Sequence, residues 1–142
     1  MKRIDKFAEI VIKKLRDENY EFYLDNKKLS QSITLDEYKL KQKNPNYDPE
    51  LQKTEDQRFE FLNSLNENQS NQLDKLILSI SDSTTFNFLR EVEENLFEDK
   101  SIGLTIENQK IEELTKELLS GTLFGEYFLW CEQKSKFGEY QF

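Results

Sequence analysis

Apolar residues recur at intervals of three and four positions through most of this chain, and this pattern limits its fold more than any other feature. Because an α-helix has 3.6 residues per turn, residues spaced in this way share one face of a helix. The first such set lies within residues 3–18 and comprises Ile4, Phe7, Ala8, Val11, Ile12 and Leu15. We expect an amphipathic helix over residues 3–18, which can continue through Leu24 because no Pro or Gly stops it.

The second half of the chain repeats the pattern. Capping-box residues at 54–57 predict the start of a helix that carries Phe59, and Asn66 to Gln69 resemble a further start signal. Helices then follow near 68–80 and 84–98, separated by residues 81–84, whose types favour helix N-termini.

Two more helices are expected before the chain ends. Thr105 or Asn108 could cap the first of them, with Ile111, Leu114 and Leu118 turned inward. The last helix is strongly apolar, and its core-facing residues are predicted to be Leu123, Phe124, Tyr127, Phe128 and Cys131.

Residues 25–57 interrupt this pattern. The segment is polar and contains both prolines of the chain, so we interpret it as a long connection or mobile arm and not as a second domain. Within it, Thr34 and Glu37 form a capping box that predicts a short helix over residues 35–43. A strand is the alternative there, because Ile33 and Leu35 alternate with polar residues.

These expectations together define a fold class. The chain has 142 residues, of which 36% are hydrophobic and 13% aromatic, which suffices for one core. We predict a single all-α domain over residues 1–142, a helical bundle of about five to seven helices with a long polar connection near residues 25–57.

Several kinds of chemistry are excluded by missing residues. The chain has no histidine, so Ser-His-Asp and Cys-His nucleophiles and His-bearing metal sites cannot form. Cys131 is the single cysteine, and its apolar neighbours suggest a buried small side chain rather than a nucleophile. The four glycines match no phosphate-binding loop. We therefore expect a protein that is not an enzyme and has no cofactor.

The acidic residues are the main candidate for a binding surface. The formal net charge is −8, which disfavours nucleic acid and membrane surfaces and favours a basic protein partner. We predict partner-binding roles for five carboxylates that fall at helical spacings, with an ordinary solvated face as the alternative; they are Glu91, Glu94, Glu98, Glu113 and Glu117.

No metal site is expected among these carboxylates. The E-E-x-x-E motif of all-α NTP pyrophosphatases would need one residue fewer between Glu94 and Glu98, and no E-x-x-D follows. A carboxylate-metal phosphoester hydrolase therefore stays only as a remote alternative.

Two aromatic residues are further candidates. Trp130 lies off the apolar stripe of the last helix, so it either packs against the tail aromatics or stands exposed as an interface anchor. Tyr47 lies in the polar segment, where it could contact a partner or belong to a flexible loop.

The location can also be predicted. A single cysteine suits a reducing compartment, no signal peptide begins the chain, and no run approaches the roughly 20 apolar residues that span a bilayer. We expect a cytoplasmic protein.

The C-terminal segment resembles a known class. A leucine-rich helix is followed by a small-residue break at Ser120 and Gly121, a helix that contains Trp130, and the tail Ser135-Lys136-Phe137-Gly138. This ending resembles that of small acidic bacterial toxin-immunity proteins. The resemblance implies a cytosolic inhibitor that blocks a toxin by direct contact. A structural or self-associating subunit is the alternative function.

Overall fold

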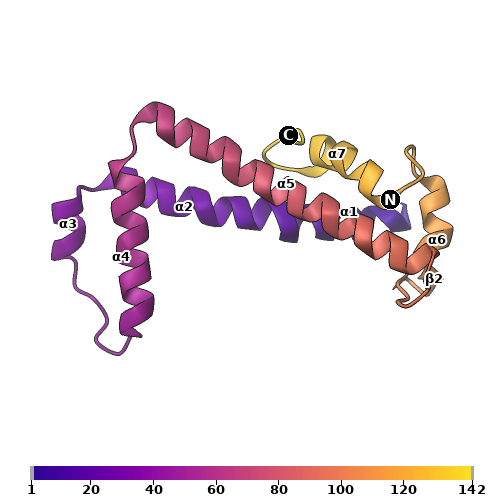
Figure 1. Cartoon of the computed structure of the whole chain (residues 1–142), viewed down its shortest axis with the longest axis horizontal. Coiled ribbons are helices and arrows are strands. Elements are labelled where there is room, and N and C mark those ends of the chain that lie inside the picture. The colour runs from indigo at the N-terminus through magenta and orange to yellow at the C-terminus, as the bar shows by residue number, and fades with distance from the viewer. Residues whose placement is uncertain (1, 142) are drawn as a thin grey trace. The chain divides into compact units, whose positions relative to one another are not determined.

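The computed structural model describes residues 2–141 and is mostly helical, which confirms the all-α prediction. Figure 1 shows the elements along the chain. They are α1 (Arg3–Ile10), a π-helix η1 (Val11–Asp17), α2 (Glu18–Ser32), α3 (Leu35–Leu40), α4 (Pro49–Ser64), α5 (Glu67–Phe97), β1 (Thr105–Ile106), β2 (Gln109–Lys110), α6 (Ile111–Leu114), a 3₁₀-helix η2 (Thr115–Glu117) and α7 (Leu123–Lys134). No helix of the described residues is both long and apolar enough to cross a membrane.

The contacts divide the chain into two compact units. The first unit combines residues 2–20 with residues 77–141, and the second comprises residues 21–76. Helices α2 and α5 each contribute to both units.

The core of the first unit joins α1, η1, the C-terminal half of α5, α6 and α7. Its fully buried apolar members are Ile4, Ala8, Val11, Ile12, Leu89, Leu96, Ile111, Leu114, Leu123, Tyr127, Trp130 and Cys131. Most of the residues that the helical spacing of 3–18 placed on one face therefore do face the core. The apolar stripe of α1 supplies Ile4 and Ala8, and η1 continues it with Val11 and Ile12, as expected for an amphipathic helix.

The predicted N-terminal helix forms and continues to Ser32, but it contains a π-helical turn that the spacing did not reveal. A π-helix closes i→i+5 hydrogen bonds, so it holds more residues per turn than an α-helix. Val11, Ile12, Arg16 and Asp17 of this turn are all buried. Arg16 already falls on the apolar stripe at steps of four from Ala8 and Ile12, and the wider turn adds Asp17 to the buried side.

The predicted break at residues 81–84 is wrong, because α5 is one continuous helix of 31 residues. Residues of these types favour helix starts only when their side chains accept hydrogen bonds from the main chain. Here Asp82 is buried and accepts hydrogen bonds from other elements, and Thr85 donates its hydroxyl to the Ser81 carbonyl one turn earlier. Asn66 and Gln69 do form the predicted capping box at the start of α5.

Residues 25–57, interpreted as a long connection or mobile arm, are mostly helical, so a long loop is wrong for most of the segment. α2 extends to Ser32, α3 follows, and α4 begins at Pro49, so the helix-free stretch shrinks to residues 41–48 with short breaks beside it. Thr34 caps α3 as predicted, by accepting a hydrogen bond from the Glu37 N–H group. The alternative of a strand there is excluded.

Helix α4 starts earlier than the capping box at residues 54–57 predicted. Asp48 caps it and Pro49 opens it, a favoured arrangement because proline has no N–H group to leave unpaired. In this second unit Tyr38 stacks on Phe59 with ring centroids 3.9 Å apart, and its hydroxyl donates to Asp56 at 2.8 Å. These contacts join α3 to α4.

The segment between α5 and α7 differs from the predicted capped helix. Thr105 lies in strand β1 and Asn108 in the turn of a two-stranded antiparallel hairpin, so neither caps α6. Glu107 and Asn108 adopt positive φ values of 51° and 66°, as the two central residues of such a tight hairpin turn require. Ile111 and Leu114 are buried as predicted.

Helix α7 forms with Thr122 as its N-cap, but its buried face is rotated from the one predicted. Trp130 is 2% exposed and Phe128 is 45% exposed, so the predicted core role of Phe128 and an exposed role for Trp130 are both wrong. Trp130 packs edge-on against Phe7, with ring centroids 6.2 Å apart. The core of this unit approaches α7 from the side of Trp130, Tyr127 and Leu123.

Candidate functional site: a buried polar network and an acidic cleft

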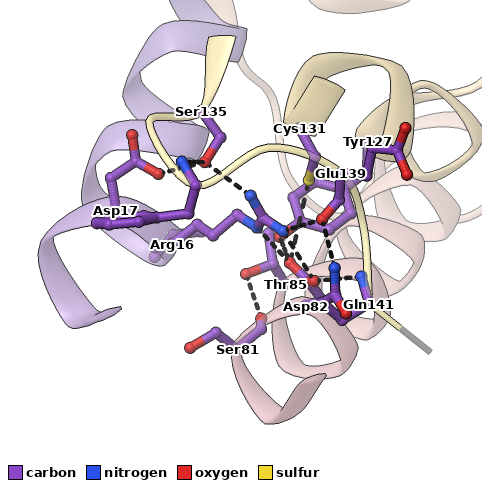
Figure 2. A network of polar contacts seen from close by, with 12 residues as sticks. Arg16, Asp17, Ser81, Asp82, Thr85, Tyr127, Cys131, Ser135, Glu139 and Gln141 are labelled. Carbon is purple, nitrogen blue, oxygen red and sulfur yellow. Dashed lines mark hydrogen bonds and ion pairs between the residues drawn. The ribbon is translucent and has the colours of Figure 1, made fainter. Parts of the chain in front are cut away.

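Arg16 and Asp82 form an ion pair in the first unit, and the side chains of both are 0% exposed. Figure 2 shows them at the centre of a network that joins η1, α5, α7 and the C-terminal tail. Charged side chains are rarely buried unless they are paired. A buried ion pair of this kind is therefore a candidate either for a reactive centre or for a structural contact.

All five N–H groups of the Arg16 guanidinium are used. Nε donates to Asp82 Oδ1 at 2.6 Å and Nη2 to Oδ2 at 3.2 Å, which is a bidentate pair. The other groups donate to Ser135 Oγ at 2.7 Å and to the carbonyls of Gly138, at 2.6 Å, and Glu139. A single side chain thus holds three residues of the tail.

Both carboxylate oxygens of Asp82 also accept further hydrogen bonds. Its Oδ1 also accepts a hydrogen bond from the Tyr127 hydroxyl at 2.6 Å, and its Oδ2 accepts one from the Gln141 N–H group at 2.8 Å. Asp17 completes the network from η1, where it accepts hydrogen bonds from the Ser135 hydroxyl at 2.6 Å and the Lys136 N–H group at 3.1 Å. Gly138 adopts a φ of +80°, which lets the tail turn back over the network.

Burial affects the protonation of two groups in this network. Burial raises the pKa of Cys131 to about 12, so its thiol stays protonated at neutral pH. Burial and then the hydrogen bond to Asp82 raise the pKa of Tyr127. No buried side-chain polar atom within residues 2–141 lacks a hydrogen-bond partner. The network clamps the tail to the helices.

The residues that carry the toxin-immunity resemblance belong to this clamp. Ser135, Lys136 and Gly138 supply the tail atoms that Arg16 and Asp17 hold, and Phe137 packs edge-on against Tyr20 with centroids 4.8 Å apart. The tail motif therefore has a structural explanation within this chain.

The five predicted partner-binding carboxylates are all exposed. Glu94 lies 3.7 Å from Arg90 of the same helix, and Glu91 accepts a hydrogen bond from Asn95 at 3.4 Å. Within the described chain, the side chains of the other three, Glu98, Glu113 and Glu117, take part in no ion pair and no hydrogen bond. Their charges are thus available to a partner.

A cleft lies between the end of α5 and the start of α6, and we call it the acidic cleft after the exposed glutamates of these two helices. The charged residues of its own lining are two glutamates and two lysines. It has a volume of about 530 Å³ and is lined by the end of α5, the connection after it, and the segment that begins α6. Phe97 and Ile102 are 39% and 46% exposed in its wall, and Glu112 and Glu113 border it together with Lys100 and Lys110. Of the five predicted carboxylates, Glu113 lines the cleft, and Glu98 directly follows Phe97.

The two predicted aromatic site residues are not part of this cleft. Trp130 is buried in the core of the first unit. Tyr47 belongs to the second unit, where its hydroxyl donates to Glu55 at 2.7 Å and holds the connection before α4. Neither residue is brought to the predicted carboxylates.

Sequence reasoning missed Arg16 and Asp82, although a signal was present. Arg16 follows Ala8 and Ile12 at steps of four, and Asp82 lies between Leu78 and Leu89 at helical spacing. Each is a charged residue in the register of a buried stripe. Two opposite charges in such registers on different helices indicate a buried ion pair.

No group of three or more Cys, Asp or Glu side chains that could hold a metal ion occurs in the described part of the chain.

No protein-family model, curated protein or solved structure matches this sequence.

Proposed function

We propose that this chain functions by binding a protein partner and catalyses no reaction. The observation that carries the proposal is the acidic cleft, where the exposed apolar side chains of Phe97 and Ile102 lie beside exposed carboxylates. Protein interfaces commonly combine apolar anchors with a charged rim that selects the partner. The buried network also supports binding over catalysis, because its buried side-chain polar atoms all have hydrogen-bond partners within the described residues.

The charge of this region favours a basic partner. Glu98, Glu113 and Glu117 have no ion-pair partner within residues 2–141, and the whole chain has a net charge of −8. Exposed charges of one sign accelerate the capture of an oppositely charged protein, by roughly 10- to 10³-fold at low ionic strength. Lys100, Lys110 and Lys116 reduce this field without cancelling it.

Within this class, an immunity-type inhibitor of a basic toxin in the bacterial cytoplasm is the specific form that we propose. The acidic charge and the resemblance of the C-terminal segment support it. A carboxylate surface could occupy the basic site that a nuclease toxin uses to hold phosphates.

Affinity purification from the native cell tests the proposal when charge variants are compared. The variant E98K/E113K reverses two carboxylates at the acidic cleft, and the control E60K/E67K makes the same charge change at two exposed glutamates of the other unit. We expect wild type and control to recover the same protein and the cleft variant to lose it. Recovery of no specific protein by wild type, or equal recovery by both variants, would contradict the proposal.

Self-association is a second candidate, because the first unit has an apolar groove elsewhere. Ile80 and Phe88 are exposed on α5 and border this groove together with Leu15. Burial of such a groove against a second copy would remove apolar surface from water. Sedimentation over a wide concentration range decides this point, since a strict monomer excludes stable self-association.

A further inference from the structure

A second pocket of the first unit is built mainly from aromatic rings, and we call it the aromatic pocket. It has a volume of about 450 Å³ and is lined by Phe86 of α5, Phe128 and Glu132 of α7, and Glu139 and Tyr140 of the tail. These five residues come from three separate parts of the chain. The pocket therefore exists only when the tail is held against the helices.

The rings of Phe86 and Phe128 both lie near the ring of Tyr140. Its ring lies at 6.1 Å and 69° from that of Phe128, and at 6.4 Å and 58° from that of Phe86, measured between centroids. Phe128 is 45% exposed, so part of its ring is open to solvent. Faces of aromatic rings carry negative charge density and attract cations within about 6 Å.

Two carboxylates border these rings. The side chains of Glu132 and Glu139 are exposed, and within residues 2–141 neither takes part in an ion pair or a hydrogen bond. The main chain of Glu139 is fixed, because its carbonyl accepts a hydrogen bond from Arg16. The clamp described above thus holds one carboxylate and one ring at the pocket.

Rings and unpaired carboxylates together select a cation that also has apolar surface. A carboxylate or phosphate ligand would be repelled by two glutamates, and a bare metal ion would gain little from three rings. A guanidinium group fits best, because it is planar, stacks on aromatic faces and donates to carboxylates at its edge. Its apolar stem would cover ring surface that is now exposed.

We propose that the aromatic pocket receives an arginine side chain of the protein partner. The source of the cation rests on the proposed function, whereas the preference of the pocket for a guanidinium group does not. The proposal adds a second binding site, at the C-terminal aromatic residues, to the acidic cleft.

Titration followed by nuclear magnetic resonance tests the chemistry without any partner. The probes are N-acetyl-arginine-N′-methylamide and its neutral analogue N-acetyl-citrulline-N′-methylamide, with aromatic ¹³C–¹H signals of Phe86, Phe128 and Tyr140 as the readout. We expect saturable shifts with the arginine probe at a dissociation constant on the order of 10 mM, and none with citrulline.

Variants identify the groups responsible. E132Q/E139Q keeps the shape of both side chains and removes both charges, so binding of the arginine probe should weaken by roughly five- to tenfold. Phe128→Leu should weaken it by roughly two- to fivefold. The matched control E60Q/E67Q, in the other unit, should leave it unchanged. Circular dichroism verifies that each variant is folded.

The outcomes separate this inference from the proposed function. No shift with the arginine probe, equal shifts with citrulline, or equal weakening by the control would overturn the arginine pocket even if a partner is recovered from cells. Specific shifts with the arginine probe would support the pocket even if the purification recovers no partner.

Discussion

Replacement of Asp82 by Asn is the sharpest test of the buried network. The amide has nearly the shape of the carboxylate, but one of its two ends becomes a donor. Asp82 Oδ1 accepts hydrogen bonds from Arg16, from Tyr127 and, at 4.0 Å, from the Cys131 thiol, and Oδ2 accepts them from Arg16 and Gln141. In the variant, the NH₂ group of the asparagine therefore faces other donors at one end of the side chain. The substitution also leaves the Arg16 charge buried without its counter-charge.

The expected loss is large. Removal of one partner of a buried ion pair costs about 3–5 kcal/mol, because the remaining charge stays out of water. Proteins are stable by only about 5–15 kcal/mol, so the variant would lose a large share of the free energy of unfolding. With a urea dependence of about 2 kcal/mol per molar, the midpoint should fall by roughly 2 M.

Trp130 makes the assay specific to the first unit. It is the single tryptophan of the chain and is buried there, so its fluorescence follows unfolding of that unit during urea titration. The control is Asp99→Asn, a change at an exposed aspartate of the same unit, which should cost less than about 0.5 kcal/mol. If Asp82→Asn differed from wild type by less than about 1 kcal/mol, the reasoning on the buried pair would be refuted.

Three further outcomes follow from the fold. Ser83→Pro should destabilise the first unit by about 3 kcal/mol in the same urea assay, because residue 83 lies inside the continuous α5; a neutral effect would indicate a helix start there. Burial raises the pKa of Glu93, against the hydrogen bond that its carboxylate accepts from the Leu123 N–H group. The stability that this raised pKa contributes is present below the ordinary value of 4.5 and is lost as pH rises through the raised value. The free energy of unfolding of wild type, relative to that of Glu93→Gln, should therefore fall with rising pH in that window. A difference that stays constant with pH would contradict this. Iodoacetamide should modify Cys131 only as fast as the first unit opens, since burial raises the pKa of the thiol to about 12; rapid labelling without denaturant would disprove its protection.

The helical fold could be predicted from the sequence because it depends on local periodicity. The stripe from Ile4 to Ile12 and the cap at Thr34 both act over one or two turns, and both are present as predicted. The break expected at Asp82 fails because a distant partner, Arg16, takes the carboxylate that would have capped a helix. Helix propensity is a local property, so it cannot predict such a long-range partner.

The candidate sites were less predictable for a similar reason. Exposure of Glu98 and Glu113 follows from their charge, but the cleft that Glu113 lines needs the hairpin β1–β2, whose turn residues carry no glycine. The buried face of α7 depends on which side the core approaches. That is why Trp130 is inside and Phe128 contributes to a surface pocket.

Site-specific photo-crosslinking in the native cell tests the central claim, that this protein binds another through the acidic cleft, most directly. A benzophenone amino acid replaces Phe97 in the cleft wall, and the matched variant carries it at Phe61, an exposed phenylalanine of the other unit. We expect one discrete adduct with a basic protein from residue 97, weakened by E98K/E113K and absent from residue 61. No adduct at residue 97, or the same adducts from both positions, would contradict it.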